Sequence, residues 1–151
     1  MITCKQVTKC FGGVTALSPF DLNLTKGEFV VIKGASGSGK TTLLLALGGM
    51  LRPTEGEIKY KGDNLYELSP SELGNYRSNE IGFVFQMFHL VPYLNVEENV
   101  QLAIPNDNQR NQSHRLLDQL GLSRRLTHTP SELSAGERQR VALARALVNQ
   151  P

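Results

Sequence analysis

The pattern of apolar and polar positions divides the chain into a strand-rich first part and a helix-rich second part. Alternating apolar residues over 2–7 and 14–24 predict two strands. The apolar run 28–33 is rich in β-branched residues and predicts a strand buried on both faces. A glycine-rich loop over 34–39 and a Leu- and Ala-rich helix over 40–50 follow. The order of strand, loop and helix begins a βαβ unit, so the pattern predicts an α/β fold.

The second part begins after a further predicted strand over 81–85. Before it, residues 69–72 (Ser-Pro-Ser-Glu) fit a capping box with proline at the first helical position. From Gln86 onward the pattern indicates helices joined by polar loops. We therefore expect an α/β core over 1–85 and a helical part over 86–151. The expected helices of this second part are 96–103, 113–120 and 136–149.

Composition and charge narrow the class of protein. Hydrophobic residues make up 40% and charged residues 20% of the chain, as in ordinary globular domains. A net charge of +2 is too small to indicate a nucleic-acid partner. No apolar run approaches the roughly 20 residues that span a bilayer, and residues 1–5 do not begin a signal peptide. Cys4 and Cys10 lack the further ligands of a zinc site. We expect a cytoplasmic protein that reaches a membrane only through a partner.

Residues 34–41 match the phosphate-loop pattern G-x-x-x-x-G-K-[ST] in full. Glycines let successive N–H groups turn toward phosphate oxygens, and the following helix adds its positive N-terminal end. Lys40 is expected to reach the β- and γ-phosphates, and the hydroxyl of Thr41 is expected to ligate Mg²⁺. The pattern therefore predicts a site for ATP and Mg²⁺. Its expected residues are Gly34, Ala35, Ser36, Gly37, Ser38, Gly39, Lys40, Thr41 and Thr42.

The segment 133–147 is the second informative motif. Ser134 and Glu137 fit a capping box, and an alanine-rich amphipathic helix follows. By itself this pattern predicts only a well-capped surface helix. With the phosphate loop upstream, the segment resembles the signature motif of ATP-binding-cassette proteins, Leu-Ser-Gly-Gly-Gln. Here Ala135 and Glu137 stand at its third and fifth positions.

The resemblance assigns roles to several residues. It implies that Ser134, Ala135, Gly136 and Glu137 complete the ATP site of an opposite subunit. A helix N-terminus is suited to that task because its free N–H groups favour an anion.

Three further segments fit the same family. Gln86 follows the expected strand 81–85, as the glutamine of the family's Q-loop does. By the resemblance it would touch Mg²⁺ and the attacking water, so Lys40 and Gln86 are the catalytic candidates. Phe11 matches the aromatic residue that stacks on adenine, although an exposed Phe can also simply cap a sheet. Residues 87–100 look like the segment that receives a transporter's coupling helix, or alternatively a hydrophobic cluster under a loop.

The resemblance also implies an architecture and partners. The fold would be a phosphate-loop NTPase core, a mixed sheet with parallel central strands, together with a helical signature subdomain. The partners would be a second copy or another cassette domain, and a transmembrane permease at the inner face of the membrane. Residues 62–65 and 69–73 look closest to the lipoprotein-releasing, macrolide-exporting and cell-division group.

Family members continue into a hydrophobic strand with the Walker B aspartate and a catalytic glutamate, and then a loop with the switch histidine. These groups do not occur in the 151 residues. The expectation is a chain cut before them, incomplete at its C-terminus, that binds ATP but hydrolyses it poorly alone. One alternative is a naturally short, non-hydrolysing nucleotide-binding module. Another is a soluble cassette protein of DNA repair or translation, which the low net charge and the transporter-like Q-loop disfavour.

Overall fold

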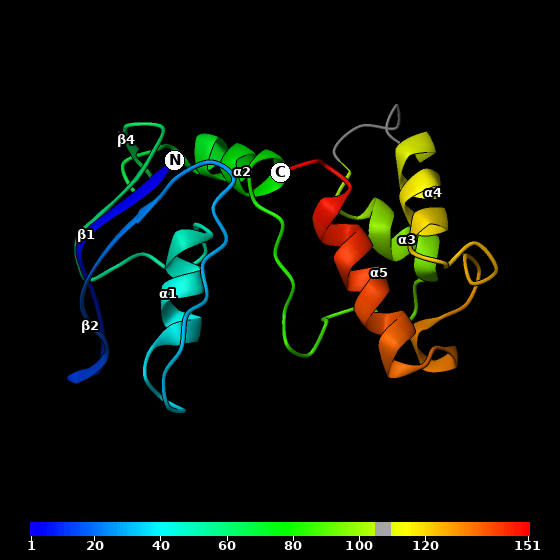
Figure 1. Ribbon diagram of the computed structural model, residues 1–151, viewed down its shortest axis with the longest axis horizontal. Helices are drawn as coiled ribbons and strands as arrows, with labels where there is room; N and C mark the ends of the chain where they lie inside the picture. The colour runs from blue at the N-terminus through cyan, green and yellow to red at the C-terminus, as the bar shows by residue number, and fades with distance from the viewer. Residues whose placement is uncertain (105–109) are drawn as a thin grey trace. The chain divides into compact units, whose positions relative to one another are not determined.

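The computed structural model describes residues 1–104 and 110–151. Two compact units divide the chain, Met1–Gly74 and Asn75–Pro151 (Figure 1). The division precedes Gln86, where the sequence changes from strand to helix character. The boundary between two compact units need not coincide with the change from strands to helices, so the expected division at residue 86 stays a prediction.

The first unit contains a four-stranded antiparallel sheet in the order β2-β1-β3-β4. Its longest strands, β1 (Ile2–Phe11) and β2 (Val14–Leu24), form a hairpin that confirms the two strands predicted from alternation. The two-residue loop, Gly12 and Gly13, has φ of 52° and 85°. Positive φ at both positions suits a hairpin turn whose twist matches that of the strands. Strands β3 (Glu55–Tyr60) and β4 (Asp63–Asn64) complete the sheet.

The helix α1 (Lys40–Leu47) contacts β2 and buries one side. Leu43, Ala46 and Leu47 are its buried residues. The hydroxyl of Tyr66 lies 2.7 Å from the carbonyl oxygen of Ala46 and 2.7 Å from that of Leu51. These contacts tie the last turn of the helix to the segment that follows it.

The second unit is helical, as predicted. Helix α2 (Pro70–Asn79) crosses the boundary and begins with the predicted capping box, in which the Ser69 hydroxyl donates to Glu72 Oε2 at 2.6 Å. The other elements are α3 (Val96–Gln101), α4 (Arg110–Gln119), the 3-10 helix η2 (Pro130–Glu132) and α5 (Ala135–Leu147). Their shared core consists of Val96, Val100, Leu117, Leu122, Leu133, Val141, Ala144 and Val148.

Two predicted strands are not formed. Residues 28–33 and 81–85 have no strand pairing in the structure. A strand buried on both faces needs ladder neighbours, and no segment within residues 1–104 and 110–151 pairs with either run. The side chain of Phe29 is consequently 90% exposed. The sheet of the described residues is antiparallel, so the parallel central strands expected from the sequence do not occur in it.

None of the helices in the described residues has the length and apolar character needed to cross a membrane.

Replacing Leu117 tests the core of the helical unit. Leu117 is 0% exposed, whereas Leu102 is 58% exposed, so the same substitution can be compared at a buried and an exposed site. Leu117→Ala should lower the free energy of unfolding by about 2–5 kcal/mol because it leaves a cavity. Leu102→Ala should change it by less than about 0.5 kcal/mol. Denaturant unfolding followed by circular dichroism measures both, and equal losses would contradict the assignment of this core.

Candidate nucleotide-binding site

The phosphate loop leads directly into α1 and depends on glycine for its shape. Gly37 and Gly39 have φ of 79° and 85°, which is left-handed backbone that residues with a side chain rarely adopt. A Cβ on Gly39 would also collide with the carbonyl oxygen of Ala16 in β2. Gly39 is the N-cap of α1, so this close approach fixes where the helix begins relative to the sheet.

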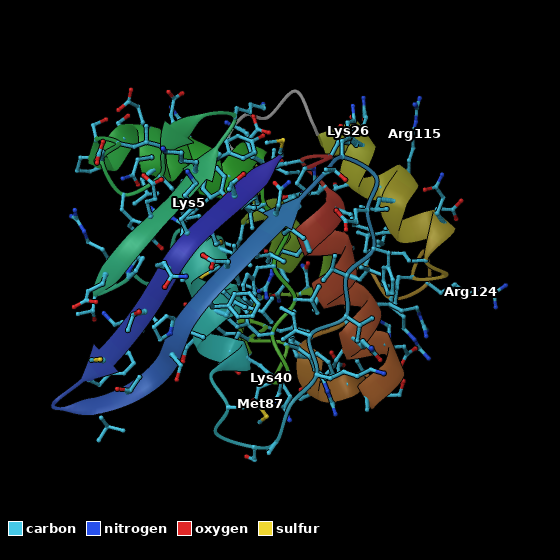
Figure 2. The ribbon with its side chains drawn as sticks, turned by 60° about the vertical axis from the view of Figure 1, so that its left-hand side comes forward. Lys5, Lys26, Lys40, Met87, Arg115 and Arg124 are labelled. Carbon is cyan, nitrogen blue, oxygen red and sulfur yellow. The ribbon has the colours of Figure 1, made fainter. Side chains whose placement is uncertain are left out.

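Lys40 lies across the loop that precedes it (Figure 2). Its Nζ donates to the carbonyl oxygens of Gly34 at 2.9 Å and Ala35 at 2.6 Å, and to Oγ of Ser38 at 3.3 Å. A Cβ on Gly34 would lie 2.5 Å from the same Ser38 oxygen. The glycine therefore lets the loop close around the lysine, and the ammonium group stands where the loop backbone curls.

The start of α1 is suited to an anion. Gly39 supplies no side-chain cap, and the described first turn of α1 contains no acidic side chain. The first N–H groups of a helix lack intrahelical acceptors and carry a partial positive charge. Thr41 is exposed and Thr42 half-buried in this turn. Together with Lys40 these groups fit the phosphates of a nucleotide.

Fewer groups of the chain are suited to hold Mg²⁺ than to hold the phosphates. Across the described residues, no cluster of three or more His, Cys, Asp or Glu side chains is placed to hold a metal. Mg²⁺ in nucleotide sites commonly takes one or two protein ligands and completes its shell with phosphates and water. The exposed hydroxyl of Thr41 suits that arrangement. Gln86 belongs to the second unit, and its role toward Mg²⁺ stays a prediction.

Phe11 ends β1 and is 50% exposed. The Nζ of Lys9 lies 5.0 Å from the centre of its ring, within the range of a cation–π contact. The same ammonium donates to the carbonyl oxygen of Arg52 at 2.8 Å. An exposed aromatic ring beside a fixed cation is suited to stacking, and its contact with adenine stays a prediction.

The predicted capping box at the start of α5 is confirmed. The backbone N–H of Ser134 donates to Glu137 Oε2 at 2.8 Å, and that of Glu137 donates to Ser134 Oγ at 3.3 Å. Ala135 and Gly136, which lie between them, are exposed. The signature residues that the sequence singled out therefore form the capped start of α5, and their role in a second ATP site stays a prediction.

Arg125 is a partner of this box that the sequence did not reveal. Its Nε donates to Glu137 Oε1 at 2.8 Å, and its Nη1 lies 3.2 Å from Nε2 of His128. The hydrogen bonds from Ser134, followed by that from Arg125, lower the pKa of Glu137 to about 2. A carboxylate that accepts several hydrogen bonds holds its charge more strongly.

Asn99 is a second residue that the sequence did not single out. It is fully buried, and its Nδ2 lies within hydrogen-bonding distance of the carbonyl oxygens of Val91, Leu94 and Asn95. Its Oδ1 accepts from the N–H of Val91 at 2.7 Å. A buried amide needs such partners. Asn99 therefore fixes the backbone of residues 91–95.

The glycine-shaped loop, its lysine and the uncapped helix define a phosphate-loop nucleotide-binding protein. Residues 17–151 match the family described as ABC transporter. The chain belongs to this family, whose ATP-binding subunits are ATPases. The resemblance inferred from the phosphate loop and the signature segment is thereby confirmed.

Relatives and solved structures agree on the family. A putative hemin import ATP-binding protein, HrtA of Staphylococcus haemolyticus, is 44% identical over 97% of this chain and 70% of its own length. The lipoprotein-releasing system ATP-binding protein LolD of Bacteroides fragilis is 43% identical over 100% of this chain and 72% of its own length. LolD of Xanthomonas campestris is 48% identical over 97% of this chain and 61% of its own length.

The dimeric structure of MJ0796, described as a bacterial ABC transporter cassette, matches with a TM-score of 0.90 and 41% identity. It covers 100% of this chain and 71% of its own chain. A post-hydrolysis state of the same cassette bound to ADP and Pi gives a TM-score of 0.89 at 40% identity. These likenesses confirm the α/β phosphate-loop ATPase fold class.

The low pKa of Glu137 predicts a pH-dependent contribution to stability. A carboxyl whose pKa falls from 4.5 to about 2 on folding stabilises the fold above pH 4.5 and loses this contribution as the pH falls through about 2. Glu137→Gln removes the titrating group. Between pH 5 and pH 2, the denaturant midpoint of the original chain should therefore fall more steeply than that of the variant. Parallel curves would show that Glu137 titrates normally.

Proposed function

We propose that residues 34–42 bind ATP with Mg²⁺ and that the chain acts in a pair of cassette domains, as a homodimer or with another such domain. The observation that carries the ATP site is the hydrogen bonding of Lys40 to Gly34, Ala35 and Ser38 in front of an uncapped helix. Lys40 would bind the β- and γ-phosphates, and Thr41 and Gln86 would hold Mg²⁺. When bound, Mg²⁺ neutralises developing charge on the phosphates.

The signature residues support a site shared between two subunits. Gly136 lies in the first turn of α5, and the nearest atom to a Cβ placed there is Arg140 Nη1 at 3.7 Å. Packing in the described chain therefore allows a side chain at this position, although glycine costs a helix about 0.5–1 kcal/mol relative to alanine. A glycine that its own chain does not require is explained by close approach of another molecule. The proposed partner is the ATP phosphate held by the opposite subunit.

The segment 87–99 supports a membrane permease as a further partner. The side chains of Met87 (Figure 2) and Tyr93 are exposed, at 77% and 81%. Asn99 holds the backbone on both sides of Tyr93 through its hydrogen bonds to Val91, Leu94 and Asn95. Large apolar side chains on a fixed backbone suit a docking surface. Docking there would place the protein peripherally at the inner face of the membrane. The net charge of +2 is too small to favour a nucleic-acid partner.

Hydrolysis by these 151 residues alone is proposed to be slow. Gln86 would orient the attacking water, but the sequence contains no hydrophobic run that ends in an Asp-Glu pair. Phosphoryl transfer depends on positioned Mg²⁺ and an oriented nucleophile, so binding and turnover should be separable here.

Calorimetric titration with Mg-ATP tests the proposed binding site. Lys40→Ala should weaken binding at least about tenfold because it removes the cation that meets the phosphates. Lys26→Ala is the matched control, since Lys26 is an exposed lysine outside the phosphate loop (Figure 2). Equal affinities of the two variants for Mg-ATP would contradict the proposal.

Gly136→Ala tests the shared site. The free energy of unfolding should rise by about 0.5–1 kcal/mol because alanine is the better helix residue. ATP-dependent association of the full-length protein should nevertheless weaken about tenfold or more, since the added methyl group meets the partner's phosphate. Analytical ultracentrifugation with and without ATP measures association. Unchanged association would contradict close approach at Gly136.

A further inference from the structure

One side chain of α5 holds the turn that follows Gln86. The guanidinium of Arg145 donates from Nη1 to the carbonyl oxygen of His89 at 2.8 Å and from Nη2 to that of Phe88 at 2.6 Å. A planar guanidinium offers donors in a fixed geometry, so it can hold two neighbouring carbonyls at once. Arg145 is half-buried, which shelters these bonds from water. The turn is thereby clamped to the helix.

The backbone of this turn needs such support. Phe88 and His89 are consecutive residues with side chains, and their φ angles are 60° and 46°. Left-handed backbone is disfavoured for both, and it persists when surrounding contacts hold it. Local contacts are the bonds from Phe88 N to Phe85 O at 3.0 Å and from His89 N to Met87 O at 2.6 Å, and an edge-on packing of the Phe85 and His89 rings, whose centres lie 4.9 Å apart. Among residues 1–104 and 110–151, the side-chain hydrogen bonds that reach Phe88 and His89 from another element come from Arg145.

The chain before the turn is attached to the same end of α5. Asn149, just beyond the helix, donates to the carbonyl oxygen of Ser78 at 2.8 Å. The backbone at Gly82 passes so close to Ala146 that a Cβ there would collide with the Ala146 carbonyl oxygen. Residues 78–89, which include Gln86, are therefore attached at three points to the C-terminal end of the helix that begins at the signature motif.

We propose that Arg145 is a positioning residue for Gln86, which it fixes to the signature helix through the carbonyl groups of Phe88 and His89. Because α5 is about 20 Å long at the helical rise, the clamp joins the Gln86 turn at one end to the capping box of Ser134 at the other. A displacement of the turn then moves the helix as one body. The consequence for ATP turnover rests on the function proposed above for Gln86 and the signature motif.

Hydrogen exchange of the full chain, followed by mass spectrometry, tests the clamp. In Arg145→Ala, the amides of residues 86–90 should exchange about tenfold faster because at least one charge-assisted hydrogen bond is lost. Arg145→Lys should give an intermediate rate, since an ammonium lacks the fork that reaches both carbonyls. The amides of 137–141, in the first part of α5, should exchange as before in both variants.

Arg115→Ala is the matched control, because Arg115 is an exposed arginine of α4 in the same unit (Figure 2). It should leave exchange at 86–90 unchanged. Unchanged exchange in Arg145→Ala would overturn the proposal. So would a loss of α5 protection in both Arg145 variants, because Arg145 would then serve folding of the helix as a whole.

Kinetics of the full-length ATPase separate positioning from mere stability. Arg145→Ala should lower kcat at least about tenfold, with KM for ATP unchanged and with partial rescue by Arg145→Lys. A rise in KM with unchanged kcat would contradict the role. Failure of Lys40→Ala to weaken ATP binding, with exchange at 86–90 still raised in Arg145→Ala, would overturn the proposed function and leave the clamp intact.

Discussion

Burial of one face of α5 is the interaction on which the helical unit depends. Val141, Ala144 and Val148 are fully buried in a cluster that includes side chains of α3 and α4. Hydrophobic burial is non-directional and uses the face of the helix that runs from Val141 to the C-cap, Val148, so polar groups on its other positions remain available. The first turn presents Ala135 and Gly136 to solvent, and the last turns carry Arg145. One packed face thus leaves positions at both ends of the helix free for two different tasks.

The phosphate loop reaches its shape by backbone geometry. Gly34 and Gly39 allow approaches that a Cβ would block, and Lys40 binds the oxygen atoms that the closed loop directs inward. The phosphate loop therefore positions Lys40 through its own backbone oxygens. Preorganisation of this kind lowers the entropy lost on binding, because the loop and its cation are already ordered.

The sequence predicted those features that are decided by residues close together along the chain. The hairpin of β1 and β2 turns at two adjacent glycines, Gly12 and Gly13, and the boxes at Ser69 and Ser134 depend on partners three residues away. Arg125 and Arg145 were missed because their partners lie 12 and 56 residues from them, and no local pattern links them. The segments 28–33 and 81–85 have strand-like composition, but a strand also needs a neighbour to pair with. Composition alone therefore predicted too many strands.

Arg125 offsets the negative charge of the acidic residue in the signature motif, Glu137. A carboxylate near a helix N-terminus stabilises the helix but would repel a phosphate at the same end. In this chain Glu137 accepts from Ser134 N with one oxygen and from Arg125 Nε with the other. The pair is close to neutral, so the potential at the start of α5 is set by the free N–H groups of the first turn. An acidic signature residue is therefore compatible with anion recognition when a fixed arginine offsets its charge.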